Sequence, residues 1–266
     1  MALLVLLCWG RTWAEEEALP PPRAALAAEL PWLHPAGTWE ADAGFRFLQS
    51  RPAPFDDSGG SRTERDVAGF DLRLAGSPAG RTEISLTAGV LDTGGAGGTE
   101  GFVASDTRVA FAVALAGGPG SRTAVAGRFT AKVPTAPEDG EAGTDESDLG
   151  FAVSGGWRGG RLGLFGSAGL DMLGNPLRNG SQDDVATYGA GGWWRASERF
   201  DLVAEVEGRA FSRFGNSAGR MLLGGEIRSG GHARGRGLSG FALLNRGLTG
   251  DAARWGFSLG LSIRKF

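Results

Sequence analysis

The sequence contains very few of the residues that build disulfides, zinc sites or nucleophilic catalysts. Its 266 residues include one cysteine, Cys8, and two histidines, His34 and His232. One cysteine allows no disulfide within the chain, and two distant histidines do not form a zinc-binding pattern. No dinucleotide-binding fingerprint or phosphate loop is present. We therefore expect no cofactor, no metal site and no catalytic residues.

Long apolar runs and an excess of positive charge are also missing. The longest early apolar run, from Ala2 to Trp9, is much shorter than the roughly 18 consecutive apolar residues of a membrane-spanning helix. The formal net charge is −3, with a pI near 5.5, so the overall field does not attract the phosphates of nucleic acid. Any membrane crossing must use strands, and nucleic acid is not an expected partner.

The first 37 residues differ in composition from the rest of the chain. An apolar stretch at residues 3–9 is followed by Thr12-Trp13-Ala14, a small-residue cleavage site, which predicts a signal peptide over residues 1–14. Residues 15–37 are acidic at first and contain Pro20-Pro21-Pro22, which predicts a stiff periplasmic leader. Residues 38–266 are expected to form one domain.

From Thr38 onward, apolar and polar residues alternate with the period of two that is typical of a strand with two different faces. In the first such segment one face carries Trp39, Ala41, Ala43, Phe45 and Phe47, and the other carries Glu40, Asp42, Gly44 and Arg46. The alternation recurs about twelve times. Two glycine-rich segments, near residues 184–195 and 234–245, leave open which residues face which side.

The connections between these segments alternate between long and short. Long ones cover residues 50–66, 92–104, 134–147 and 173–183, and short ones cover 76–80, 117–120, 158–160, 196–198 and 229–231. This arrangement predicts an all-β fold: a single antiparallel transmembrane barrel of about 12 strands, with short periplasmic turns and longer external loops. The barrel must close, because lipid cannot satisfy the backbone groups of an open sheet edge. Aromatic residues near strand ends fit interfacial girdles: Trp39, Trp157, Tyr188, Trp193 or Trp194, and Trp255.

Charged residues fall on the polar face of the predicted strands. An arginine or lysine facing lipid near the bilayer midplane would cost roughly 2–4 kcal/mol, so the alternation directs these residues into the lumen. The candidate lumen-lining residues are Asp71, Arg73, Arg108, Arg128, Lys132, Asp201, Glu205, Glu207, Arg209, Arg220, Glu226 and Arg228, with Asp42, Arg46, Glu83 and Arg264 on the same face. They indicate either a salt-bridged filling or a selective permeation path.

Several motifs carry a resemblance to a known family. Lys132-Val133-Pro134-Thr135, an acidic loop and Ser147-Asp148-Leu149-Gly150-Phe151 are followed by a glycine-rich strand at residues 160–169 and a closing strand at residues 256–266. These segments resemble the outer-membrane barrel transporter family of the meta-pathway of phenol degradation, over residues 36–266. The resemblance implies location in a bacterial outer membrane and uptake of small hydrophobic or aromatic compounds. The terminal Phe266 resembles the signal that the barrel-assembly machinery recognises.

Three functions remain open from the sequence. The first is an outer-membrane channel or transporter for small solutes, and the second is a closed structural or adhesive barrel. The third is a lipid hydrolase, which we disfavour because His34 lies in the leader and His232 lies beside a periplasmic turn. We therefore expect no enzyme activity. The acidic loop at residues 138–148 is expected to be a solvated surface.

Overall fold

The computed structural model describes residues 21–22, 30–52, 64–92, 101–136, 147–174, 182–210, 218–229, 236–249 and 252–265. No helix in these ranges is long and apolar enough to cross a membrane. The predicted signal peptide at residues 1–14, most of the acidic loop, His232 and Phe266 lie outside the described residues.

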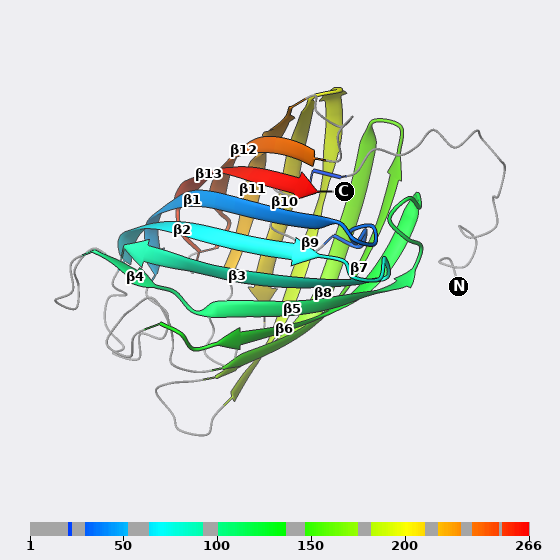
Figure 1. Cartoon of the computed structure of the whole chain (residues 1–266). Coiled ribbons are helices and arrows are strands. Elements are labelled where there is room, and N and C mark those ends of the chain that lie inside the picture. Colours follow the sequence, from blue (N-terminus) through cyan, green and yellow to red (C-terminus); the bar gives the residue numbers. More distant parts are fainter. Residues whose placement is uncertain are drawn as a thin grey trace.

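The described residues contain thirteen strands (Figure 1). They are β1 (Trp39–Pro52), β2 (Glu64–Gly76), β3 (Thr82–Asp92), β4 (Phe102–Ala104), β5 (Thr107–Ala116), β6 (Thr123–Val133), β7 (Asp148–Gly159), β8 (Leu162–Gly174), β9 (Gln182–Ser197), β10 (Phe200–Ala210), β11 (Ala218–Arg228), β12 (Arg236–Gly247) and β13 (Trp255–Lys265).

The sheet closes on itself, as Figure 1 shows. The first and last strands pair antiparallel, from Trp39 opposite Lys265 to Gln49 opposite Trp255. Both β4 and β5 pair with β3, so they occupy one strand position of the barrel, which is interrupted at Ser105 and Asp106. The thirteen strands therefore form the predicted closed antiparallel barrel with twelve strand positions. The expected boundary of the connection over residues 92–104 was wrong, because residues 102–104 continue the ladder on β3.

The two ends of the barrel are different. At one end β1 begins, β13 ends and short turns join β2 to β3, β5 to β6, β7 to β8 and β9 to β10; we call it the terminal end. At the opposite end, which we call the loop end, β1, β3, β6 and β8 end and β2, β4, β7 and β9 begin. Gly80, Gly117 and Gly160 occupy turns at the terminal end with positive φ angles of 69°, 69° and 54°, a conformation that glycine adopts without steric cost.

Burial follows the predicted alternation along the strands. On β7, Leu149, Phe151, Val153 and Trp157 are exposed on the outer face, while Ser154 and Arg158 are buried on the inner face. The exposed outer face is largely apolar and offers a surface suited to lipid. The charged inner face makes cross-strand contacts instead. Period-two geometry is sufficient for this result, because successive side chains on a strand point to opposite faces.

The structure settles the facing of the two glycine-rich strands. On β9, Val185, Trp193 and Arg195 point inward, and Tyr188 and Trp194 point outward. On β12, the inward side chains include Ser239, Phe241, Leu243 and Asn245, and the outward ones include Leu238 and Leu244. Of the two neighbouring tryptophans on β9, only Trp194 can therefore belong to an outer aromatic girdle. Trp39, Trp157, Tyr188 and Trp255 are exposed on the same outer surface.

Candidate functional site in the barrel lumen

All twelve candidate lumen residues lie at inward positions of the strand alternation. They come from β2, β5, β6, β10 and β11. Eight of them form ion pairs with residues of other strands: Asp71, Arg73, Arg128, Lys132, Asp201, Arg220 with Glu207, and Arg228. Glu205 and Glu226 are almost fully buried, at 3% and 2% exposure. Arg108 and Arg209 are more exposed and have no ion pair among the described residues.

One carboxylate at the terminal end is held between two guanidinium groups. Oδ1 of Asp201 on β10 lies 3.0 Å from Nε of Arg195 on β9, and Oδ2 is bound by Arg228 on β11. Asp201 has no exposed surface. Breaking such a buried pair is strongly destabilising, because it leaves a charge without compensation. These contacts therefore join three consecutive strands near their turns.

A second carboxylate near the terminal end forms ion pairs with arginines of two other strands. Oε1 of Glu83 on β3 lies 3.7 Å from Nη2 of Arg73 on β2 and 3.5 Å from Nη2 of Arg128 on β6. Arg73 also donates a hydrogen bond of 2.9 Å to Asp42 on β1. This network spans the part of the wall that runs from β1 to β6.

Lys132 anchors the loop end of β6. Its Nζ lies 2.9 Å from Asp148 on β7 and 3.3 Å from Asp106 in the break between β4 and β5. Oδ1 of Asp106 also accepts hydrogen bonds from the backbone nitrogens of Thr135 and Ala136. Lys132, Thr135 and Asp148 thus belong to one polar network, which Asp106 connects, at the loop end of the barrel.

Two further pairs lie on the inner wall toward the loop end. Arg46 on β1 lies 3.2 Å from Asp71 on β2, and Nε of Arg220 on β11 donates to Glu207 on β10 over 2.6 Å. Both pairs are partly exposed to the lumen. Partly solvated pairs contribute little to stability, so these two pairs are expected to add less to the stability of the barrel than the buried Asp201 pair.

The inner wall also contains an apolar strip that the sequence analysis missed. The strip consists of Phe165 on β8, Trp193 on β9, Val203 on β10, Leu222 on β11 and Leu243 on β12. These side chains are buried in one cluster with Ala124 and with Leu30 and Trp32, which precede β1, and Phe241 packs against the cluster. It covers the wall from β8 to β12. The lumen is therefore amphipathic rather than uniformly charged.

A signal for the strip is present in the sequence. Each of its five main members belongs to a pair of adjacent apolar residues: Leu164-Phe165, Trp193-Trp194, Leu202-Val203, Leu222-Leu223 and Leu243-Leu244. In a period-two pattern one member of such a pair must point inward. Charged residues at other inward positions of the same strands made the inner face look polar in the sequence, so the apolar strip was not recognised.

Residues 30–35, which we call the strap, run along the inside of the barrel before β1. The indole of Trp32 meets Trp193 edge to face and donates a hydrogen bond of 2.9 Å from Nε1 to the main-chain oxygen of Ser121. The guanidinium of Arg158 lies 5.4 Å from the centre of the indole ring. Gly156 makes room for this ring, because a Cβ atom there would lie 2.5 Å from it. Trp32 is therefore fitted into the wall of the barrel.

The strap reaches the opposite wall through His34. The Nδ1 atom of its ring lies 2.7 Å from Oε2 of Glu83 on β3, and Nε2 lies 3.0 Å from Oε2 of Glu40 on β1. Between these two anchors, Leu33 packs against Ala112, Ala114 and Ala126 of β5 and β6. The strap thus crosses the terminal end of the lumen, from the apolar strip to the wall that carries Glu40 and Glu83.

The strap changes the expectation for residues 15–37. The sequence assigned all of them to a leader in the periplasm, but the structure buries residues 30–34 inside the barrel. Gly37, with a φ angle of 75°, provides the turn from the strap into β1. The leader was misassigned over these residues because an irregular segment has no periodicity that reveals its partners.

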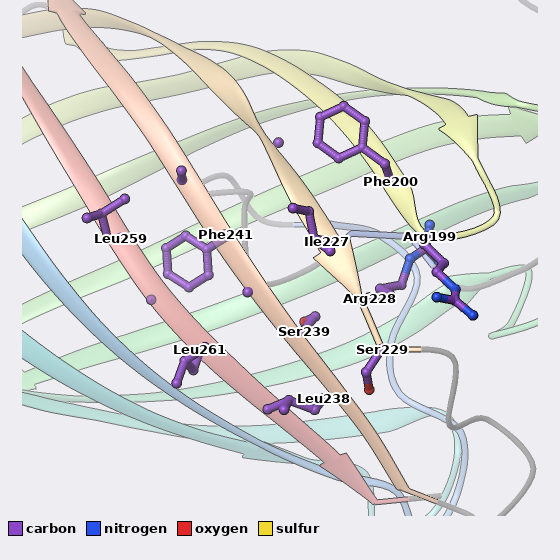
Figure 2. Close-up of a pocket in the computed structure, with 14 residues that line it drawn as sticks. Arg199, Phe200, Ile227, Arg228, Ser229, Leu238, Ser239, Phe241, Leu259 and Leu261 are labelled. Atoms are coloured by element: carbon purple, nitrogen blue, oxygen red, sulfur yellow. The ribbon is translucent and has the colours of Figure 1, made fainter.

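A separate hollow lies on the wall formed by β11, β12 and β13 near the terminal end. Figure 2 shows the apolar side chains around it, among them Phe200, Ile227, Leu259 and Leu261, with Arg199 at one edge. Most of these side chains alternate outward, so lipid would cover them. Within the described ranges, no three His, Cys, Asp or Glu side chains are grouped so that they could hold a metal ion. The candidate site is therefore the lumen.

Comparison with known proteins supports the fold. No family model and no curated protein matches the sequence. The COG4313 outer-membrane channel from Pseudomonas putida F1 has a similar structure, with a TM-score of 0.62 and 11% identity over 90% of this chain and 99% of that one. The NanC porin has a TM-score of 0.56 and 9% identity over 86% of this chain and 99% of that one. At such low identity the likeness establishes the fold alone: this chain has the closed twelve-stranded barrel architecture of outer-membrane channels.

Proposed function

We propose that this protein is a channel of a bacterial outer membrane that passes small solutes with an apolar or aromatic part. The observation that carries the proposal is the apolar strip on the inner wall. Ligand sites that bind apolar molecules are lined mainly by apolar and aromatic side chains, with a few polar groups that fix orientation. The lumen of this barrel combines the strip with charged side chains on the facing wall.

The location and orientation belong to the same proposal. An apolar outer face supports residence in lipid. The short turns at the terminal end would lie in the periplasm and the longer connections outside, after export by a signal peptide at residues 1–14. The likeness to outer-membrane channels supports this placement. Assembly through the strand that ends at Phe266, and the link to phenol degradation, remain predictions.

The strap favours a second candidate, a closed structural barrel. Trp32 and His34 are buried at 1% exposure each, and their contacts span the terminal end of the lumen. A strap that stays in place narrows the terminal end of the lumen. The two candidates therefore differ in whether the protein conducts.

A lipid hydrolase has less support. Both ring nitrogens of His34 contact carboxylate oxygens, whereas a catalytic histidine needs one nitrogen directed at the nucleophile. His232 lies outside the described residues. We therefore do not propose an enzymatic function.

Reconstitution of the full chain tests the proposal. We expect discrete conductance steps in planar bilayers and swelling of proteoliposomes in phenyl β-glucoside. Methyl β-glucoside is the matched polar probe, and its entry should be no faster although the molecule is smaller. The absence of both conductance and swelling would show a sealed barrel, and release of fatty acids would show a hydrolase.

A pair of variants connects the result to the apolar strip. Leu222→Asn places an amide of similar size on the inner wall, and Leu223→Asn makes the same change on the outer face of the same strand. We expect Leu222→Asn to slow phenyl β-glucoside more than methyl β-glucoside. Equal effects on both probes would show that solutes do not use the strip.

A further inference from the structure

The place in the inner wall that holds Trp32 is matched to both rings of its indole. The main-chain oxygen of Ser121 accepts a hydrogen bond of 2.9 Å from Nε1 on the five-membered ring. At the six-membered ring, a Cβ atom on Gly156 would lie 2.5 Å from Cη2 and 2.8 Å from Cζ3. The ring centre of Trp193 and the guanidinium carbon of Arg158 lie 5.6 Å and 5.4 Å from the centre of the indole. We call the place bounded by these four residues the indole slot.

The aromatic wall of the slot is held by contacts within the barrel. Trp193 stacks on Phe165 of the neighbouring strand β8, with 6.4 Å between the ring centres and 28° between the planes. Its ring also covers Gly163, where a Cβ atom would lie 2.1 Å from Cζ2 of the indole. Neither contact involves Trp32, so we expect Trp193 to keep its position when the strap leaves.

The polar side of the slot is also held without the strap. Nε of Arg158 donates a hydrogen bond of 3.0 Å to the main-chain oxygen of Ser121, and Nη2 donates to that of Pro119. Both acceptors lie in the turn between β5 and β6. The Ser121 oxygen can accept a second hydrogen bond besides the one from Arg158, because a carbonyl oxygen has two lone pairs. A site whose groups are already in place loses little free energy to ordering when it binds a ligand.

These groups define the molecule that the slot binds. Edge-to-face packing and a nearby guanidinium both favour an electron-rich aromatic face, and indole is the strongest case among side-chain rings. The slot meets the ligand at Ser121 on one ring and at Gly156 on the other, so a bicyclic molecule fills it. A ring that carries a positive charge would be repelled by Arg158. The slot therefore suits a neutral bicyclic aromatic molecule with an N–H group.

We propose that the indole slot is a binding site for such a solute and that Trp32 occupies it as an internal competitor. The strap keeps Trp32 near the slot at an effective concentration on the order of millimolar, so a free solute displaces it only at similar concentrations. A bound solute keeps the strap out of the slot. That this widens the path through the barrel rests on the proposed channel function, whereas the binding itself does not.

The test measures binding of indole to the full chain in detergent micelles by isothermal titration calorimetry. Trp32→Ala removes the competitor and leaves the walls of the slot unchanged. We expect indole to bind this variant at least about tenfold more tightly than the wild type, in which the tethered ring competes. 1-Methylindole has the same rings without the N–H group. It should bind Trp32→Ala roughly fivefold more weakly than indole does, because one neutral hydrogen bond is lost.

Two adjacent tryptophans of β9 provide matched controls in the Trp32→Ala chain. Trp193 is 5% exposed on the inner wall, and Trp194 is 48% exposed on the outer face. Adding Trp193→Ala should abolish the binding of indole, whereas adding Trp194→Ala should leave it unchanged. Indole that dissolves in the micelle alone would give the same signal in all of these chains.

The outcomes separate the slot from the channel. Equal indole binding in the wild type and in Trp32→Ala, with heat-modifiable gel migration showing folded barrels, would overturn the indole slot. Equal effects of Trp193→Ala and Trp194→Ala would do the same. Binding that depends on Trp193 without any conductance would instead reject the channel and leave the slot intact.

A refolding measurement covers the case in which Trp32→Ala folds poorly. Indole added during refolding should then raise the folded fraction of this variant, because it fills the place of the missing side chain. 1-Methylindole should raise it less. No gain with indole would count against the slot as clearly as an absence of binding.

Discussion

The indole rings of Trp32 and Trp193 meet edge to face, with 5.6 Å between their centres and 85° between their planes. This is a preferred geometry for aromatic pairs, because the positive edge of one ring faces the negative face of the other. One residue precedes the barrel in sequence and the other belongs to β9. Their contact therefore joins the strap to the apolar strip, and it makes the position of the strap testable.

Replacing Trp32 should loosen the strap. Trp32→Ala removes the contact with Trp193, the hydrogen bond to Ser121 and the stacking with Arg158. Loss of a buried tryptophan typically costs about 3–5 kcal/mol, so we expect the strap to detach and the single-channel conductance to rise. Trp157→Ala, on the outer face of β7, is the matched control. Unchanged conductance in Trp32→Ala would mean that the strap does not limit passage.

The two anchors of the strap should act together. His34→Phe keeps a ring but removes the nitrogens that contact Glu83 and Glu40, so we expect its conductance to rise as well. If the strap leaves as one unit, the double variant with Trp32→Ala will conduct no more than either single variant. Additive increases would show that the two ends move independently.

Asp201 should be important for stability. Asp201→Asn leaves Arg195 and Arg228 without their shared carboxylate, and breaking a buried ion pair in this way costs about 3–5 kcal/mol. Urea unfolding in lipid vesicles should show this loss. Asp184→Asn on the exposed outer side of β9 is the control and should change stability very little. A similar small change in both variants would show that the guanidinium groups find other partners.

The face assignment can be tested with two adjacent small residues of β8. Ala168 points outward, whereas Ser167 points inward and pairs with Ser154 and Gly189. Ala168→Arg would place a charge in lipid near mid-strand, which costs about 2–4 kcal/mol. Ser167→Arg can extend into the lumen and should cost less. Equal losses in the two folded variants, measured by urea unfolding, would contradict the assigned facing.

The sequence by itself determined the strand positions, the outer face and the inward direction of the charges. Period-two alternation carries this information, because a side chain on a strand has only two directions and lipid accepts only one kind of surface. The apolar strip was also encoded, in doublets such as Leu222-Leu223, although the charges on neighbouring positions obscured it.

Only the tertiary structure decided what lies across the lumen. Ring closure places Glu40 of β1 and Glu83 of β3 around His34. Local pattern cannot reveal these contacts, because they depend on how the strands curve and close around one axis. The strap has no repeating pattern, so its place inside the barrel follows from the apolar and acidic walls that the closed sheet provides.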